Sequence, residues 1–499
     1  MQSAHSPCRH RPRRRSTACA GLVLAVATTS CGGHAARTLE ARNALDAGDP
    51  RTALALINEE LGVDRAEQLP KDLSGDQAIL LLDRAMVLQQ LDEYKLSSRD
   101  LQVADKQIEV LDLSRSAAAD IGRYLFSDST GPYKAPAYEK LMINSMNLVN
   151  YLVRQDLSGA RVEARRLAVM QRYLKETENP GASLAAPGSY LAGFVFEKSG
   201  RAEEALRYYD EALKYGSYRT LTEPVRRLAK DTSFRSPRIR EILGDADPRL
   251  KPVESGTDVP EGESDETAQP EAANADERKH AGKASKPAAA PEPDFTDTHG
   301  ELLVIVNFGR VPAKYAKRIP IGLALTYASG AISPNDRGRA NALAAQGLVT
   351  WVNYPELGKA RGQYSVPTFA LDGQGQFLEG VLAVDREAKV AWETARGGVV
   401  GSAITRMLTR VVAGEAVRRG SGGGALSLLL GLGTQATLTA TDTPDTRSWA
   451  TLPARIAFGR VWVKSGRHQI LLGARSIEKR GEVDVPAGGF SVVNLTVLH

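Results

Sequence analysis

The middle of the chain holds the feature that most limits how the whole can fold. From about Asp247 to Asp294 the residues are mainly Pro, Ala, Glu, Asp and Lys, and large apolar side chains are almost absent. Such a segment cannot bury enough apolar surface to offset the entropy lost on ordering, so residues 246–298 are predicted to be a disordered linker. Because 499 residues are enough for two or three domains, we expect a folded domain on each side of it.

Helical periodicity dominates the part of the chain before the linker. Residues 38–61 predict a pair of helices interrupted at Gly48-Asp49-Pro50, and Pro50 suits the first turn of the second helix. Further helical segments are expected at residues 76–111, 138–153 and 158–177.

The clearest helical unit is residues 189–213, where small and aromatic residues fall at the spacing of a tetratricopeptide repeat. These residues are Gly193, Phe196, Gly200, Ala205, Tyr209 and Ala212. The small residues let the two helices approach closely, and helix pairs of this kind bury their apolar faces by stacking on neighbours. Residues 38–245 are therefore predicted to form an all-α, tetratricopeptide-like helical array.

Beyond the linker the pattern changes to short apolar runs of strand length. Strands are expected at residues 301–308, 348–354, 368–371, 377–384, 456–463, 468–472 and 490–498, and one helix at residues 401–417. The closing residues 461–498 predict three successive hairpin strands, separated at Ser465-Gly466 and at residues 486–489. Residues 299–499 are thus predicted to be a β-rich domain, α+β or sandwich-like, and the chain as a whole to be multidomain.

The start of the chain predicts export. Five arginines precede an apolar run, residues 18–27, that is too short to cross a bilayer as a helix, and small residues then lead to Cys31. The run Thr28-Thr29-Ser30-Cys31-Gly32 resembles the lipobox of bacterial lipoproteins, although Thr28 stands where the usual box has a branched apolar residue. The resemblance implies that residues 1–30 are a signal peptide, that Cys31 is lipidated and that residues 31–37 form a tether. The alternative is an ordinary secretory peptide cleaved nearby.

Cysteine and charge composition exclude several kinds of function. The chain has 3 cysteines, and two of them, Cys8 and Cys19, lie in the predicted leader. A mature chain that starts at Cys31 would hold no other thiol, which excludes disulfides, cysteine zinc sites and thiol nucleophiles. The formal net charge of +5 is matched by the five leader arginines, so nothing indicates a nucleic-acid partner.

Signatures of catalysis are also missing from the sequence. No pair among the 7 histidines has the spacing of a metal site, and His468, the one within a predicted strand, is expected to be structural. There is no Gly-x-Ser-x-Gly elbow and no phosphate-binding Gly-x-x-x-x-Gly-Lys loop. We therefore expect a protein that is not an enzyme and has no catalytic residues, metal or cofactor.

Two stretches are candidate partner-binding surfaces. In the first, residues 131–139, two prolines stiffen a loop at a helix entrance, and stiff aromatic contacts lose little entropy on binding. Its candidate residues are Tyr133, Lys134, Tyr138 and Glu139. The alternative is a connector whose tyrosines pack on adjacent helices.

The second stretch, residues 442–456, lies directly before a predicted strand. Its candidate residues are Arg447 and Trp449, which could form part of a ligand or partner surface. In the alternative, Trp449 fills one end of the β core and Asp445 caps the turn.

Together with the lipobox, these stretches resemble a family of Gram-negative lipoproteins with tetratricopeptide-like N-terminal halves. The matching pieces are Pro132-Tyr133-Lys134, residues 137–140, residues 160–166, residues 445–449 and Leu452-Pro453-Ala454. The resemblance covers nearly the whole mature chain except the linker. It assigns no catalytic residue, because the activity of the family is not established. Members are often encoded near lipoproteins that activate peptidoglycan synthases, which implies a role in the cell envelope.

The sequence therefore predicts a non-enzymatic scaffold of the cell envelope. Lipid on Cys31 would hold it at a membrane, and Gly32 rather than Asp after the cysteine implies the outer membrane, facing the periplasm. The helical groove would bind an envelope protein, and the tethered β-rich domain would reach a second ligand. The alternative is a peptidoglycan- or carbohydrate-binding protein that uses residues 299–499, with Trp449 as a stacking platform; an enzyme ranks third.

Overall fold

The computed structural model describes residues 33–112, 133, 135–176, 184–244, 298–346, 351–359, 364–420 and 444–499. The predicted leader, Cys31, Lys134 and almost all of the predicted linker lie outside these residues.

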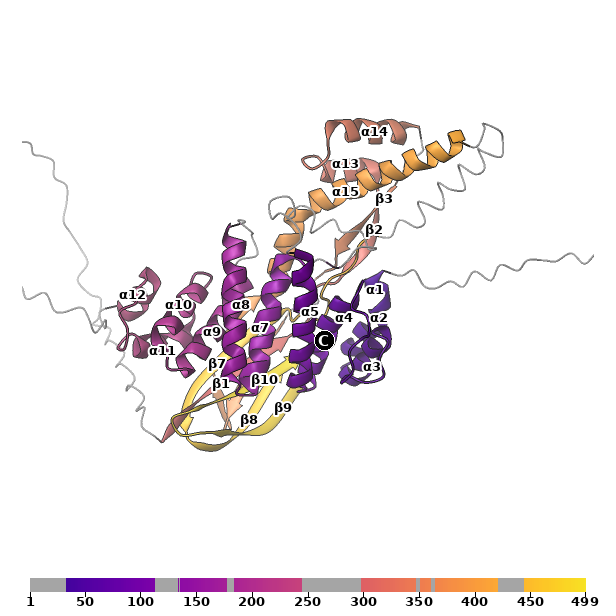
Figure 1. Cartoon of the computed structure of the whole chain (residues 1–499). Helices are drawn as coiled ribbons and strands as arrows, with labels where there is room; N and C mark the ends of the chain where they lie inside the picture. The colour runs from indigo at the N-terminus through magenta and orange to yellow at the C-terminus, as the bar shows by residue number, and fades with distance from the viewer. Residues whose placement is uncertain are drawn as a thin grey trace, which may run out of the picture. The chain divides into compact units, whose positions relative to one another are not determined.

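The N-terminal half is helical, as predicted (Figure 1). Its described elements are α1 (His34–Arg37), α2 (Leu39–Asp46), α3 (Pro50–Glu60), α4 (Gln77–Gln90), α5 (Tyr94–Asp112), α7 (Ala137–Val153), α8 (Leu157–Glu176), α9 (Ala186–Lys198), α10 (Ala202–Leu213), the 3-10 turn η2 (Arg219–Leu221), α11 (Thr222–Leu228) and α12 (Pro237–Leu243). The break between α2 and α3 follows from local chemistry. Gly48 adopts a positive φ of 78°, and Asp49 caps α3 by accepting a hydrogen bond from the Thr52 amide at 3.0 Å.

The prediction of a single helical block over residues 76–111 is wrong. The chain turns between α4 and α5 at residues 91–93, where Asp92 adopts a φ of 63°. An aspartate tolerates this left-handed conformation better than most residues, and the local pattern of apolar residues does not reveal it.

Helices α9 and α10 pack as closely as the repeat-like spacing predicts. A Cβ atom on Gly193 would lie 2.3 Å from the Tyr209 ring, so any side chain there would force the helices apart. Phe196 and Tyr208 stack with ring centroids 5.1 Å apart, and Gly200 supplies the turn with a φ of 72°.

The C-terminal half is rich in strands, as predicted. Its described strands are β1 (His299–Phe308), β2 (Lys314–Pro320), β3 (Trp351–Leu357), β4 (Thr368–Leu371), β5 (Gln374–Gln376), β6 (Glu379–Ala383), β7 (Arg455–Lys464), β8 (Gly466–Ala474), β9 (Ile477–Val485) and β10 (Phe490–Val497). The helices among them are α13 (Ile321–Tyr327), α14 (Pro334–Ala345) and α15 (Val384–Gly420). The strands form a central sheet in the order β10-β1-β7-β6, an outer sheet in the order β5-β4-β8-β9 and a two-stranded sheet of β2 and β3.

Strand β1 shows how the layers are built. Because successive side chains of a strand point to opposite faces, Leu302, Val304 and Val306 join the core shared with the outer sheet. Leu303 and Ile305 point the other way and join the core of the helices. The central sheet is therefore covered by the outer sheet on one face and by helices on the other.

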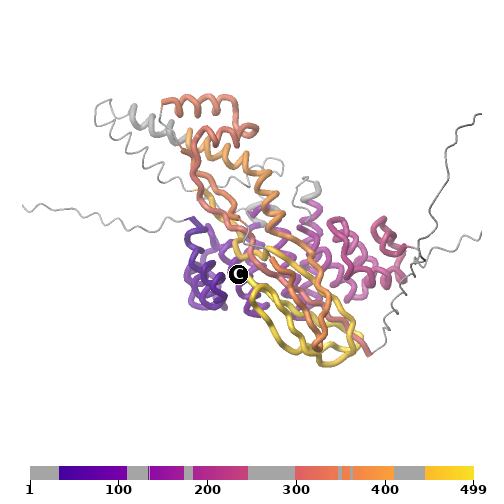
Figure 2. Tube along the Cα trace, turned by 180° about the vertical axis from the view of Figure 1, so that it is seen from behind, coloured from indigo at the N-terminus to yellow at the C-terminus, as the bar shows by residue number. Residues whose placement is uncertain are grey.

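Aromatic contacts fasten the helices to the central sheet. Tyr190 of α9 packs on Phe458 of β7 with ring centroids 4.7 Å apart, and Phe194 meets Phe490 of β10 at 5.4 Å. Figure 2 follows the trace from behind and shows the C-terminal strands running alongside the helices. The two halves thus share one hydrophobic core within the compact unit Gly33–His499.

The prediction of three successive hairpin strands at the end of the chain is wrong in two respects. Residues 461–498 contain a further turn, where Arg475 adopts a φ of 58° and joins β8 to β9 as a hairpin. Strand β10 then leaves this hairpin and pairs in parallel with β1, with Glu301 opposite Phe490. Hairpin signals lie in local sequence, whereas this parallel pairing joins segments far apart in the chain.

Candidate functional site

The chain itself covers the helix face that was expected to hold a partner. Residues 444–452 run along α4 and α7, and Trp449 is fully buried there. The Trp449 indole Nε1 donates to the Leu82 carbonyl oxygen at 3.0 Å, and its backbone amide donates to Glu139 Oε1 at 3.1 Å. Trp449 packs on helices rather than at one end of the β core, and it presents no surface on which a sugar could stack.

Glu139 is the centre of the first predicted stretch. Tyr133 donates its hydroxyl hydrogen bond to Glu139 Oε2, and Tyr138 donates to Oε1 at 3.4 Å. Burial raises the pKa of the Glu139 carboxyl, although Tyr133, Lys314 and the Trp449 amide offset part of the shift. Burial, reinforced by the Glu139 charge, also raises the pKa values of both tyrosines.

The two predicted stretches therefore meet, although 310 residues separate Glu139 from Trp449. Arg447 also lies over the Tyr133 ring, with its guanidinium carbon 5.6 Å from the ring centroid. All five described candidates are buried against one another, with exposed fractions from 0% to 8%. Their contacts hold the chain together, in line with the connector alternative for the first stretch, whereas Trp449 of the second stretch packs on helices rather than at one end of the β core.

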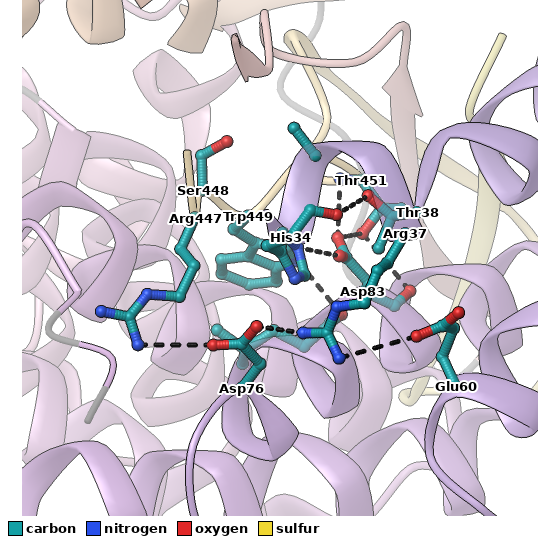
Figure 3. A network of polar contacts seen from close by, with 12 residues as sticks. His34, Arg37, Thr38, Glu60, Asp76, Asp83, Arg447, Ser448, Trp449 and Thr451 are labelled. Carbon is teal, nitrogen blue, oxygen red and sulfur yellow. Dashed lines mark hydrogen bonds and ion pairs between the residues drawn. The ribbon is translucent and has the colours of Figure 1, made fainter. Parts of the chain in front are cut away.

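Arg447 also joins a chain of ion pairs at the start of the described chain (Figure 3). Its Nη1 lies 3.4 Å from Asp76 Oδ1, and Asp76 in turn binds Arg37 of α1. Asp445 caps the turn as expected, because its Oδ1 accepts the Arg447 amide at 3.0 Å. Two segments from opposite ends of the sequence are thereby fixed to α4.

His34 is the functional candidate that sequence reasoning missed. It lies in the predicted tether yet is only 2% exposed, with its Nε2 3.3 Å from Asp83 Oδ2 (Figure 3). Asp83 Oδ1 accepts hydrogen bonds from the Thr451 amide at 3.0 Å and the Thr451 hydroxyl at 2.8 Å. No local pattern marks His34, because its partner lies 49 residues later in α4.

A pocket opens beside this junction, and we call it the N-terminal pocket. It has a volume of about 470 Å³ and is bounded by Gly33, Leu39, Arg42, the segment from Arg310 to Ala316, Gly358 and Lys359, together with Thr446 and Ala450. Arg310 is 3% exposed and donates from Nη2 to Asp46 Oδ1 at 2.6 Å. Burial lowers the pKa of the Arg310 guanidinium to about 10, because Asp83 and Tyr364 offset only part of the desolvation.

A second charged group, the Arg460 cluster, joins α9 to the central sheet. Arg460 Nη2 lies 2.6 Å from Glu197 Oε1, its Nε binds Glu301, and its Nη1 donates to the Tyr209 hydroxyl at 3.0 Å. Burial acts to raise the pKa of the Glu197 carboxyl, but Arg460, Lys198 and Arg227 together hold that pKa below its ordinary value.

The Arg460 cluster borders a wide hollow of about 1200 Å³, which we call the Trp462 hollow. Trp462 contributes an indole over which Lys198 Nζ lies at 5.2 Å and the Arg227 guanidinium carbon at 4.9 Å from the ring centroid. Glu197 and His299 also line the hollow.

Three further observations concern His468, metal-binding groups and membrane-spanning helices among the described residues. His468 has a structural role: its Nδ1 lies 2.7 Å from Asp372 Oδ2 and its Nε2 lies 2.7 Å from the Lys464 carbonyl oxygen. In the part of the chain that the structure describes, no group of three His, Cys, Asp or Glu residues could hold a metal ion. No described helix combines the length and the apolar character that a membrane span requires.

Comparison of the chain with protein-family models, with curated proteins and with solved structures found no match. The function is therefore argued from the geometry of these sites.

Proposed function

We propose that this protein is a non-enzymatic lipoprotein of the cell envelope, held at a membrane by lipid on Cys31, that binds its ligand at the face where the described chain begins. The observation that carries the proposal is the burial of His34 against Asp83, three residues after Cys31. Because His34 is fixed to α4, a lipid on Cys31 would hold this face of the protein close to the membrane surface.

The ligand site proposed here lies outside the helical groove that the sequence predicts to bind a partner. Trp449 and the central sheet cover the face of α4 and α7 that an envelope protein would otherwise use. The N-terminal pocket, in contrast, is open and lies beside the proposed anchor. A scaffold role remains part of the proposal, with partners bound on exposed surfaces rather than inside the helical array.

Membrane fractionation of the native cells tests the anchor directly. We expect the wild-type protein to sediment with membranes and to carry acyl chains on Cys31, as judged by intact mass. The Cys31→Ala variant lacks the thiol that is acylated. We expect it either to be released from the membrane or to stay there only through an uncleaved leader, which intact mass would show. A soluble, unmodified wild-type protein would contradict the proposal.

A second candidate function is binding of peptidoglycan or another carbohydrate, now through the Trp462 hollow. An indole beside carboxylate and cationic groups is a suitable surface for a polar, ring-shaped ligand. Trp449, which was the first choice for stacking, is buried and unsuitable.

Pull-down on isolated cell wall tests this second candidate. Retention of the full chain should fall at least severalfold in Trp462→Ala if the hollow holds the glycan. The matched control is Trp351→Ala, which alters a 45% exposed indole on β3 and should leave retention unchanged. Equal retention of all three proteins would rule out the Trp462 hollow as the binding site.

A further inference from the structure

The N-terminal pocket is lined by cations and by no carboxylate. Arg42, Arg310, Lys314 and Lys359 contribute the charges, and no Asp or Glu is among the described residues that bound it. A site with this imbalance favours an anionic ligand, because desolvated cations gain most from a charge of opposite sign.

Arg310 supplies the independent evidence for a ligand. Its Nη2 is used by Asp46 and the Arg42 carbonyl oxygen, but Nε and Nη1 are buried and have no hydrogen-bond partner among the described residues. Leaving buried donors of a charged group unpaired costs free energy. Nε and Nη1 lie on different edges of the guanidinium, so each can donate a single hydrogen bond to an oxygen of an anionic ligand.

The mouth of the pocket is apolar. Leu39 and Tyr315 line the pocket and are 49% and 46% exposed, so both can contact an apolar part of a ligand. Tyrosine beside exposed apolar groups and cations is typical of surfaces that lie in the headgroup region of a bilayer. The volume of about 470 Å³ is within the range of roughly 300–1,000 Å³ that holds small ligands.

The position of the pocket favours an anion carried by a membrane lipid over a free anion. Gly33, two residues after Cys31, forms part of its wall. An anchor at Cys31 would therefore bring the pocket to the membrane surface, where phosphates carried on apolar tails are concentrated.

We propose that the N-terminal pocket binds the phosphate of an anionic phospholipid headgroup, with Arg310, Lys314 and Lys359 around the phosphate and Leu39 and Tyr315 against the apolar part. This inference rests on the proposed membrane anchoring. It gives the anchored protein a second, headgroup-specific contact with the bilayer.

Calorimetric titration of the full chain with a soluble short-chain phosphatidylglycerol tests the inference without a membrane. We expect saturable binding that weakens by roughly tenfold or more in Lys314→Gln/Lys359→Gln, because two charge-assisted contacts to the phosphate are lost. Lys359 is exposed, but Lys314 is half-buried and its charge also acts on the buried Glu139 carboxyl, so circular dichroism checks the fold of the double variant and Lys359→Gln is measured alone beside it. Arg310→Gln should weaken binding as well, with circular dichroism as the check on its folding.

A matched control removes two cations elsewhere. Lys389→Gln/Arg467→Gln changes side chains that are 68% and 76% exposed and line no part of the pocket, so its affinity should equal that of the wild type. The test variant and the control variant each lose two positive charges, so nonspecific attraction to the lipid is equal in the two.

Titrations with the lipid and with inorganic phosphate, on the wild type and the variants, distinguish the possible results. Binding of inorganic phosphate as tight as that of the lipid would overturn the assignment to a phospholipid. An affinity unchanged by the lysine variant, or no binding at all, would overturn the pocket as an anion site. Membrane fractionation tests the anchor independently. If the protein binds the lipid but is not acylated, the proposed anchoring is wrong and the phosphate site stands. If the protein is acylated but binds no lipid, only the phosphate site is wrong.

Discussion

Replacing Trp449 with alanine is expected to lower the free energy of unfolding by about 3–5 kcal/mol, the usual cost of truncating a large buried aromatic side chain. Trp449 is fully buried, and its indole donates to the Leu82 carbonyl oxygen. It lies between helices of the N-terminal half and strands of the C-terminal half. The variant leaves a cavity in the core and removes one of the hydrogen bonds to the Leu82 carbonyl oxygen. Urea unfolding followed by circular dichroism should show a clearly lower midpoint.

Trp351→Ala is the matched control for this experiment. Its indole is 45% exposed and contacts the guanidinium of Arg318 at 5.5 Å, so we expect a change of at most about 0.5–1 kcal/mol. If both variants lost the same small amount, residues 444–452 would not be part of the helical core.

Arg460→Met should also cost about 3–5 kcal/mol at neutral pH, because it leaves buried carboxylates short of their main cation. Glu197 and Glu301 are 4% and 0% exposed in their side chains, and both bind Arg460. Lys198 also contacts both carboxylates, with its Nζ 3.2 Å from Glu197 Oε1 and in an ion pair with Glu301, and Arg227 binds Glu197, so these two cations offset part of the lost charge. Urea unfolding at pH 7 measures the loss.

The pH dependence of this loss has a definite sign. Because the folded pKa of Glu197 is depressed, ion pairing stabilises the wild type above the ordinary glutamate pKa, and that stabilisation is lost as the pH falls. Without Arg460 the Glu197 carboxylate takes up a proton more readily in the folded state, because the first of the cations that lower its pKa is missing. The gap between the two proteins should therefore narrow at pH 4 compared with pH 7.

A second substitution checks that the loss comes from charge. Adding Glu301→Gln to Arg460→Met should recover part of the stability, since it removes one of the uncompensated carboxylates. Additive losses in the double variant would show instead that Arg460 contributes by packing alone.

The elements that could be predicted are those whose own sequence carries a periodic apolar pattern. Strand β1 and the α9–α10 pair were predicted because each buries apolar residues at a regular spacing. Strand β9 was missed because it lies at the edge of the outer sheet and consists largely of charged, exposed residues. Strand β2 was missed for a related reason: most of its side chains are exposed or half-buried.

The candidate sites were predictable only in part. Sequence singled out Tyr133, Glu139 and Trp449 as unusual, but nothing local could indicate that they meet. His34 and Arg310 carried no signal at all, since their character arises from burial beside groups that lie far along the chain. Distance in sequence, rather than residue type, is what kept these sites hidden.

The parallel pairing of β10 with β1 has a consequence for biosynthesis. Helices α4 and α7 leave the ribosome long before β10, which packs on both of them and whose Thr496 hydroxyl donates to Gln89 of α4 at 3.0 Å. A nascent chain must therefore keep an apolar helix face uncovered until nearly all its residues are made. A chaperone that shields such faces would bind the unfinished chain through the surface that the finished protein conceals.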